Sequence, residues 1–84
     1  MIHKIYSVYD SKAESYTPPF FQHQEAMALR TFGDCCNDEG HTFGKHPEDY
    51  TLFNLGIWDD SNGTITQDQI ISVAVGHTLI GKNT

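Results

Sequence analysis

One stretch of the sequence, Trp58 to Gln69, has the oxygen-rich composition of a calcium-binding loop. An EF-hand loop places ligands at positions 1, 3 and 5, a glycine at position 6 and a bidentate glutamate at position 12. With Gly63 at position 6, Asp60 and Asn62 stand at positions 3 and 5, but Trp58 and Gln69 stand at positions 1 and 12. Two anchoring ligands are therefore missing. The Asn62-Gly63 pair instead predicts a hairpin with a two-residue type I′ turn, in which both central residues have positive φ.

A second group of residues, Cys36, His41 and His46, with Cys35 adjacent, offers soft ligands for zinc. Structural zinc sites usually present cysteines two to four residues apart, and adjacent cysteines rarely ligate one ion together. The alternative is that both thiols pack as small apolar side chains of a helix. We therefore predict no metal site and no cofactor, and the adjacent cysteines favour a reducing compartment over a disulfide framework.

The acidic residues show no catalytic arrangement, because they fall in expected turns and helix ends, where carboxylates cap backbone amides. Neither a Gly-x-Ser-x-Gly motif nor a P-loop is present in the sequence. Glu25 interrupts an apolar stripe and has two interpretations, a buried functional carboxylate or a first-turn acid favoured by the helix dipole. We prefer the second interpretation and expect the protein not to be an enzyme.

The chain has 84 residues, with 11 acidic residues against five lysines and arginines, and its net charge is −6. This length predicts one domain, residues 1–84, with a small core. The negative charge argues against tight non-specific binding to a phosphate backbone. The N-terminus lacks a long apolar segment and no apolar run has membrane-spanning length, so we expect a soluble protein that stays in the cytoplasm, with no membrane partner.

The hydrophobic pattern predicts an α+β fold, a small antiparallel sheet with one amphipathic helix in the order strand, helix, strand, strand, strand. The β-branched and aromatic residues 2–9 predict the first strand, and residues 10–19 a connecting loop. A helix is expected from about Phe21 to Cys36, and a loop from there through Pro47. Alternation predicts three further strands, at residues 50–58, 64–67 and 71–79.

Both faces of the first predicted strand are apolar, which implies that something covers the face away from the helix. We predict that Tyr6, Val8, Leu52 and Trp58 form that face and that it is the contact of a homodimer. Another candidate is the segment His46-Pro47-Glu48-Asp49-Tyr50, either a loop that recognises a partner or a Pro-initiated turn whose acids bind backbone amides. These two interpretations of the loop stay open.

An alternative function for the second face is single-stranded DNA binding, with bases stacked on Tyr6 or Trp58. The basic residues available for phosphate contacts in this alternative are Lys4, Lys12, Arg30 and Lys45. Single-strand binders use a basic groove, and this chain has few bases to build one. Clustering of the four bases on one face would favour this alternative.

Three segments resemble the small nonstructural protein of gokushovirus-type Microviridae, which are small single-stranded DNA phages. The resemblance covers most of the chain through about residue 66. The segments are Tyr6-Ser7-Val8-Tyr9-Asp10-Ser11-Lys12-Ala13-Glu14 with Pro19-Phe20, Ala28-Leu29-Arg30-Thr31-Phe32-Gly33-Asp34, and His46-Pro47-Glu48-Asp49-Tyr50-Thr51-Leu52-Phe53-Asn54-Leu55-Gly56 with Asp59-Asp60.

This resemblance implies a protein made in the cytoplasm of the infected bacterium and absent from the virion, similar in role to protein C of bullavirus phages. Protein C is associated with the switch from duplex replication to single-stranded genome synthesis coupled to packaging. The resemblance therefore implies a non-enzymatic accessory protein of phage DNA replication, which contacts a phage or host replication protein. It implies no catalytic residues.

Overall fold

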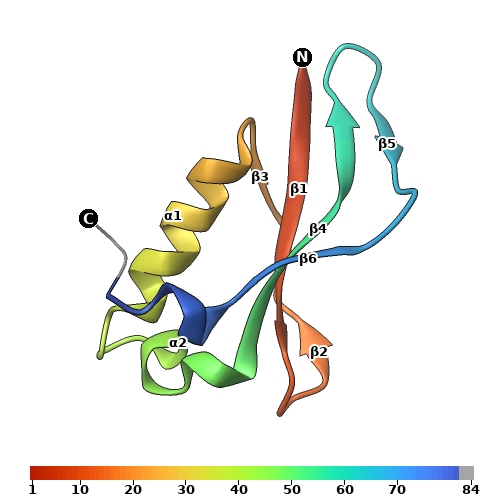
Figure 1. Cartoon of the computed structure of the whole chain (residues 1–84). Helices are drawn as coiled ribbons and strands as arrows, with labels where there is room; N and C mark the ends of the chain where they lie inside the picture. Colours follow the sequence, from red (N-terminus) through yellow and green to blue (C-terminus); the bar gives the residue numbers. More distant parts are fainter. Residues whose placement is uncertain (82–84) are drawn as a thin grey trace.

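Two long strands, β1 (Ile2–Asp10) and β4 (Tyr50–Asp59), run antiparallel through the centre of the protein. The computed structural model describes residues 1–81 and has a six-stranded antiparallel sheet and one main helix, α1 (Glu25–Cys36) (Figure 1). The predicted α+β class is confirmed. The other elements, in chain order, are β2 (Ser15–Tyr16), β3 (Phe20–Gln22), α2 (Thr42–Lys45), the 3-10 turn η1 (Pro47–Asp49), β5 (Thr64–Thr66), β6 (Ile71–Val75) and the 3-10 turn η2 (Gly76–Leu79).

The short strands complete the two sides of the β1/β4 pair. β2 and β3 both pair with β1, at opposite ends of its free edge. β5 and β6 likewise divide the free edge of β4, with β5 beside its C-terminal end and β6 beside its N-terminal half. Figure 1 shows that α1 lies beside the middle of β1, while the β4–β5 hairpin extends beyond the helix. Each long strand thus has its backbone groups paired on both sides over much of its length.

A β-bulge in β4 moves its side chains from one face of the sheet to the other. Asn54 and Gly56 pair with consecutive residues of β1, so Leu55 is an extra residue without a partner on β1. Because side chains alternate along a strand, one extra residue reverses the faces beyond it. Leu52 and Trp58 therefore lie on opposite faces, although they are an even number of residues apart.

The hydrophobic core lies between α1 and one face of the sheet. Its buried members come from both long strands and from the inner side of the helix, and they are Tyr6, Val8, Ala28, Phe32, Cys36, Tyr50 and Leu52. The helix residues Ala28 and Phe32 are one turn apart, which is the spacing of one helix face. Phe20, Leu29, Phe43, Val73 and Leu79 are partly buried against this cluster.

The predicted exposed face is therefore corrected for three of its four residues. Tyr6, Val8 and Leu52 are at most 3% exposed and belong to the core beneath α1. Tyr6 and Val8 share a face because they are two positions apart, and that face packs on the helix. Of the four predicted residues, only Trp58 lies on the other face, because the bulge separates it from Leu52.

Helix α1 begins at Glu25, not at Phe21 as predicted from periodicity. Residues 20–22 instead form β3, which supplies hydrogen bonds to the free edge of β1 with residue types that favour strands. Glu25 is exposed and lies in the first turn, so the interpretation as a dipole-favoured acid is confirmed. Asn37 ends the helix, and its amide donates to the carbonyl oxygens of Gly33 at 2.7 Å and Leu79 at 3.0 Å.

Three predicted segments have different boundaries in the structure. The expected loop at residues 10–19 contains β2, since the Asp10 carboxylate accepts hydrogen bonds from the amides of Lys12 and Ala13 and closes a turn. The expected loop before Pro47 contains the short helix α2. The last strand ends at Val75, because the chain turns into η2 there.

The β4–β5 hairpin is present as predicted, but the prediction of a two-residue type I′ turn is wrong. Residues 60–63 form the turn, and only Gly63, with φ of 75°, has a positive φ there. The Gly63 amide donates to the Asp59 carbonyl oxygen at 2.8 Å, and the Asp59 carboxylate accepts from the Ser61 amide at 3.0 Å. These side-chain and backbone hydrogen bonds stabilise the longer turn.

Candidate binding surface

The face of the sheet opposite α1 carries five aromatic side chains and one isoleucine. We call this set the aromatic face, and its members are Tyr9, Tyr16, Phe21, Phe53, Trp58 and Ile65. Paired residues in an antiparallel sheet share a face. The assignment follows from the register, in which Tyr9 pairs with Tyr16 and Ile65 pairs with Trp58.

One half of the aromatic face is a cluster of three rings on β1, β2 and β4. The Tyr9 and Tyr16 ring centroids are 4.8 Å apart, and Phe53 lies 5.7 Å from Tyr16 and 6.3 Å from Tyr9. The two contacts of Phe53 are edge-to-face, which is a favourable arrangement of aromatic quadrupoles. Tyr16 remains 45% exposed, so this cluster reaches the solvent.

The other half surrounds the C-terminal end of β4. Phe21 meets Trp58 edge-to-face with centroids 5.5 Å apart. On another side of Trp58, the centroid of the His3 ring lies 4.9 Å from that of the indole. The centroid of the His23 ring lies 4.4 Å from that of His3. Phe21 is 45% exposed and Ile65 is 67% exposed. This half therefore presents apolar surface with imidazoles at its border.

Two buried residues of β1, Ile5 and Ser7, join the halves. Ile5 pairs with Phe21 of one half, and Ser7 pairs with Phe53 of the other half. The two halves are therefore adjacent, because Ile5 and Ser7 are neighbours on the same face of β1. Ser7 has no exposed surface, and its hydroxyl donates to the Thr17 carbonyl oxygen at 2.7 Å. The buried hydroxyl of Ser7 is therefore satisfied by the neighbouring loop, and it adds no unpaired polar group to the centre of the face.

Charged groups gather at one end of the aromatic face. The N-terminal ammonium of Met1 contacts Asp60 at 2.7 Å, and the His3 imidazole contacts the same carboxyl group at 2.8 Å. Hydrogen bonds from the ammonium and from His3 lower the pKa of Asp60. The hydrogen bond to Asp60 raises the pKa of the N-terminus in turn. This cluster ties the start of β1 to the end of β4.

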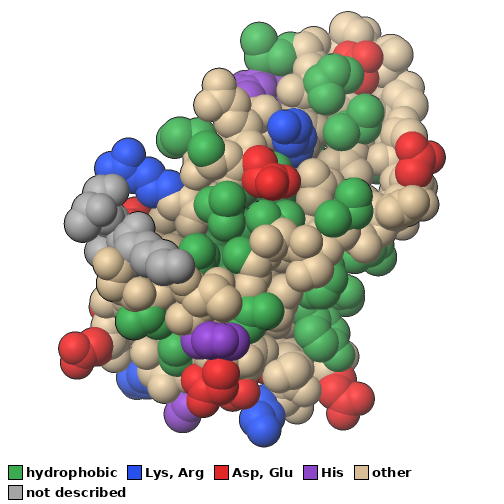
Figure 2. Space-filling view, viewed as in Figure 1, with side chains coloured by type: hydrophobic (Ala, Val, Ile, Leu, Met, Phe, Trp, Pro, Cys, Tyr) green, Lys and Arg blue, Asp and Glu red, His purple; other side chains and the backbone are tan. Residues whose placement is uncertain are grey.

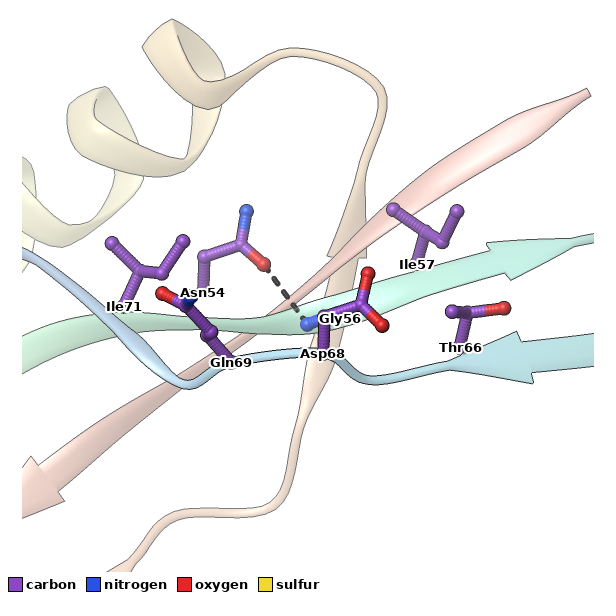
Figure 3. A pocket seen from close by; sticks show the side chains of 7 residues that line it. All are labelled: Asn54, Gly56, Ile57, Thr66, Asp68, Gln69 and Ile71. Carbon is purple, nitrogen blue, oxygen red and sulfur yellow. Dashed lines mark hydrogen bonds between the residues drawn. The ribbon is translucent and has the colours of Figure 1, made fainter.

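An open pocket of about 360 Å³ lies between the two short strands beside β4. Its lining combines isoleucine side chains with amide, hydroxyl and carboxyl groups, from Asn54, Gly56, Ile57, Thr66, Asp68, Gln69 and Ile71 (Figure 3). The Asn54 side-chain oxygen accepts a hydrogen bond from the Gly56 amide at 2.9 Å. That bond fixes the bulge. Asp68 is the one acid of the lining and is exposed.

The predicted partner loop is only partly available to a partner. His46 and Glu48 are exposed, while Pro47 and Asp49 are partly buried in η1. Tyr50 is 7% exposed, and its ring packs 4.5 Å from that of Phe43 at the edge of the core. Tyr50 therefore belongs to the core and not to a recognition surface, because the chain turns inward after η1.

The four predicted phosphate contacts lie on different elements. Lys4 lies on β1 and alternates onto the same side as Tyr6, whereas Lys12 lies in the β1–β2 turn. Arg30 is on α1 and Lys45 is on α2. On the face shown in Figure 2, Lys and Arg side chains lie apart from one another, with acidic side chains between them. The described basic residues thus do not gather on the aromatic face.

The cysteine and histidine group considered for zinc does not converge. Among residues 1–81, no three His, Cys, Asp or Glu side chains are grouped so that they could hold a metal ion. Cys36 is 1% exposed, and burial raises the pKa of its thiol to about 11. Burial, followed by the charges of Asp34 and Asp38, also raises the pKa of Cys35. Both thiols are therefore protonated at neutral pH, whereas a metal binds the thiolate.

Sequence reasoning missed most of the aromatic face. The sequence predicts a loop at Tyr16 and a helix at Phe21, and the predicted position of Leu52 on the face away from the helix implies the helix side for its neighbour Phe53. The adjacent pair Phe20-Phe21 after two prolines was the available signal, since consecutive aromatic residues favour a strand with two apolar sides. The bulge left no comparable signal, because Leu55 continues the alternating pattern.

No helix within residues 1–81 is long and apolar enough to cross a membrane. Comparison with curated proteins and with solved structures gave no match. A protein family described as Phage ORF5 protein matches residues 3–79, a range that covers the strands except the first residue of β1, both helices and the aromatic face. The chain is thus a phage protein and belongs to the Phage ORF5 protein family.

Proposed function

We propose that this phage protein is a non-enzymatic accessory protein of DNA replication, acting by contact with a replication protein in single-stranded genome synthesis and packaging. The observation that carries the proposal is the exposed pair His46 and Glu48 at the short turn η1, in a chain of net charge −6. Exposed polar side chains on a fixed turn suit contact with a protein, because little conformational entropy is lost when they bind. A phosphate backbone instead needs clustered cations, and the four described ones lie on separate elements.

The family match shows a phage protein, and the proposed role in replication rests on the resemblance of three segments to the gokushovirus nonstructural protein. One of these segments begins at His46 and continues through η1 into β4. We propose accordingly that the protein acts in the cytoplasm of the infected bacterium and is absent from the virion. We also propose that its own contribution is binding and not bond chemistry.

We assign contact with the replication protein to the exposed part of the loop at residues 46–49. Its side chains His46 and Glu48 project from a short turn that is held between core residues. The loop is anchored on the β1 side by the Ser11 amide, which donates to the Asp49 carbonyl oxygen at 3.0 Å. A rigid, polar projection offers a partner specific hydrogen bonds at a small entropic cost.

The decisive experiment compares wild-type phage with phage that carries an early stop codon in this gene. Duplex replicative DNA and single-stranded genomes are counted separately in infected cells over time. We expect duplex DNA to accumulate normally while single-stranded DNA falls at least about tenfold, and plasmid-borne wild-type protein should restore it. Equal single-stranded synthesis without the protein would refute the proposal.

The partner loop is tested in the same complementation assay. A His46→Ala/Glu48→Ala variant should fold normally yet fail to restore single-stranded DNA, since only exposed side chains are removed. A matched control is Glu39→Ala, which removes an exposed acid from the turn after α1. Restoration by the loop variant would place the partner contact elsewhere on the protein.

Direct binding of single-stranded DNA is a second candidate, favoured by the exposed rings of Tyr16 and Phe21, on which bases could stack. Its phosphate contacts would come from Lys4, Lys12, Arg30 and Lys45. We expect weak affinity for a mixed-sequence oligonucleotide at about 150 mM salt, because bulk charge repels the strand. Submicromolar binding in fluorescence anisotropy would favour this candidate over the first.

A further inference from the structure

We propose that the aromatic face is the contact surface for a second copy of this chain, and that the protein is a symmetric homodimer formed by packing sheet on sheet. The six residues of the aromatic face replace the surface expected from sequence, of which only Trp58, which is partly buried, lies on the face away from α1.

The area of the aromatic face is that of the largest apolar patches on monomeric proteins, which are often functional. Tyr16 and Phe21 are each 45% exposed, and Ile65 is 67% exposed. With the partly exposed rings of Tyr9, Phe53 and Trp58, the exposed area is on the order of 400–500 Å², given about 150–250 Å² for each whole aromatic residue. That is comparable to the largest patch of a typical monomer and about half of one side of a standard interface.

The size of the core points in the same direction. Within residues 1–81, the buried apolar side chains are few and lie only on the helix side of the sheet, with the exception of Ile5. A chain of this size buries a small share of its surface on folding, so that a second apolar layer adds substantially to its stability. A second copy supplies that layer without any further gene product.

Charge selects a second copy over a nucleic acid. The six members of the aromatic face carry no charge, and its titratable neighbours are His3 and His23 on one side and Asp59, Asp60, the N-terminus and Asp10 at the strand ends. Two such faces can pack against each other about a two-fold axis. The aromatic rings of the two copies would then be in contact, and the acidic side chains would lie at the rim of the interface. A polyanion would find no described lysine or arginine among the rings.

The edges of the sheet favour contact through faces and not through strand addition. β2 has two residues and β3 and β5 have three each, so the edges that they form are short, and among the described strands only β6, with five residues, offers a longer edge. Short edge strands resist pairing with another sheet. Two sheets packed face to face lie about 10 Å apart, which accommodates one interdigitated layer of aromatic side chains.

Light scattering and sedimentation equilibrium test the assembly with the full chain. The mass of one chain is 9.5 kDa, so a dimer should have twice that mass at micromolar concentration. Trp58 is the only tryptophan and belongs to the aromatic face, so its fluorescence reports on this surface directly. Dilution should shift the emission to longer wavelength as the dimer dissociates and water reaches the indole.

Two lysine substitutions distinguish this surface from others. Phe21→Lys should weaken dimerisation at least about 100-fold, since a charge would be buried without a partner. The control Met27→Lys alters a residue of α1 that is 48% exposed, outside the aromatic face, and should change the dissociation constant by less than about threefold. Both substitutions reduce the net negative charge equally, so a difference between them is local. Circular dichroism establishes that both variants are folded.

A monomer at about 100 µM would overturn the proposal, as would a dimer that Met27→Lys disrupts as strongly as Phe21→Lys. A monomer whose Trp58 emission is quenched by single-stranded oligonucleotide would assign the aromatic face to nucleic acid instead. None of these results bears on the phage complementation assay, so the proposed role in replication is tested independently.

Discussion

At the scale of single residues, Tyr6 combines a packed ring with an unsatisfied hydroxyl. The side chain has no exposed surface, and its hydroxyl has no hydrogen-bond partner within the described residues. Burial, and then the charge and the approach of the Glu25 carboxylate, raise the pKa of the phenol, while the Asn54 side chain opposes the rise; neither group meets the geometry of a hydrogen bond to the hydroxyl. A buried polar group without a partner costs free energy, about 1–3 kcal/mol in mutational series.

Tyr6→Phe should therefore leave the free energy of unfolding unchanged or raise it by up to about 1 kcal/mol, because the ring is kept and only the unsatisfied hydroxyl is lost. Urea unfolding followed by circular dichroism measures this change. A loss greater than about 1 kcal/mol would show instead that the hydroxyl makes a stabilising hydrogen bond, for example to an ordered water.

The two thiols lead to a prediction about metals. Cys36 is buried with a pKa raised to about 11, and the described histidines do not gather around it. Dialysis against a chelator should leave the melting temperature unchanged, because the described residues offer no group of three ligands through which a metal could stabilise the fold. A fall of several degrees after dialysis, reversed by zinc or calcium, would contradict this expectation.

At the scale of elements, the bulge in β4 depends on Gly56. Its φ is 149°, and a β-carbon at this position would lie 2.3 Å from the Thr66 carbonyl oxygen of β5. A side chain would thus be strained by the backbone conformation and would also push β5 away from β4.

Gly56→Ala should lower the free energy of unfolding by about 2–4 kcal/mol, from strain and steric overlap together. The matched control is Gly63→Ala in the hairpin turn, where φ is 75° but nothing lies within 4 Å of an added β-carbon. Gly63→Ala should lower the free energy of unfolding by only about 1 kcal/mol, because backbone strain is its only cost. Equal losses in urea unfolding of the two variants would mean that β5 moves aside freely.

Hydrophobic periodicity predicted the long strands and the body of α1, since each buries a regular stripe against the core. It placed the start of the helix too early, because Phe21 fits the helical stripe as well as it fits β3. Periodicity also reversed the faces of β4 before the bulge, since alternation alone does not say which side meets the helix. Pairing with β1, a long-range property, decides both points.

The candidate surface was harder to predict than the fold. Tyr6, Val8 and Leu52 were recognised as apolar residues that need cover, but that cover is α1 itself. Phe53 and Trp58 share the opposite face only because Leu55 is an extra residue in β4. A single unpaired residue thus changes which side chains form a surface, and no composition or charge pattern marks it.

At the scale of the whole molecule, the charge cluster that joins Met1, His3 and Asp60 makes stability depend on pH at both extremes. The pKa of Asp60 is lowered in the folded state, so its contribution is present above about pH 4 and is lost as the pH falls through the lowered pKa. The pKa of the N-terminus is raised, so its contribution is present below about pH 8 and is lost as the pH rises.

We therefore expect a plateau of stability between about pH 5 and 7.5, with losses on both sides. The raised pKa of the Cys36 thiol adds to the loss above about pH 8.5, because ionisation then favours the unfolded chain. Melting temperatures across this range measure the profile. Asp60→Asn should flatten the acid side and reduce the alkaline loss, and an unchanged profile in that variant would exclude the cluster as its cause.

The pairing of β1 with β4 also dictates when the protein can fold during its synthesis. Asp10 pairs with Tyr50 and Ile2 with Asp59, so the first strand has no long partner until most of the chain has been translated. At about 5–20 residues per second, the apolar β1 waits for a time on the order of seconds. During that wait, its two apolar sides are exposed to other nascent chains and to ribosome-associated chaperones. β1, which lies at the centre of the folded sheet, is therefore a segment of the nascent chain that we expect chaperones to bind.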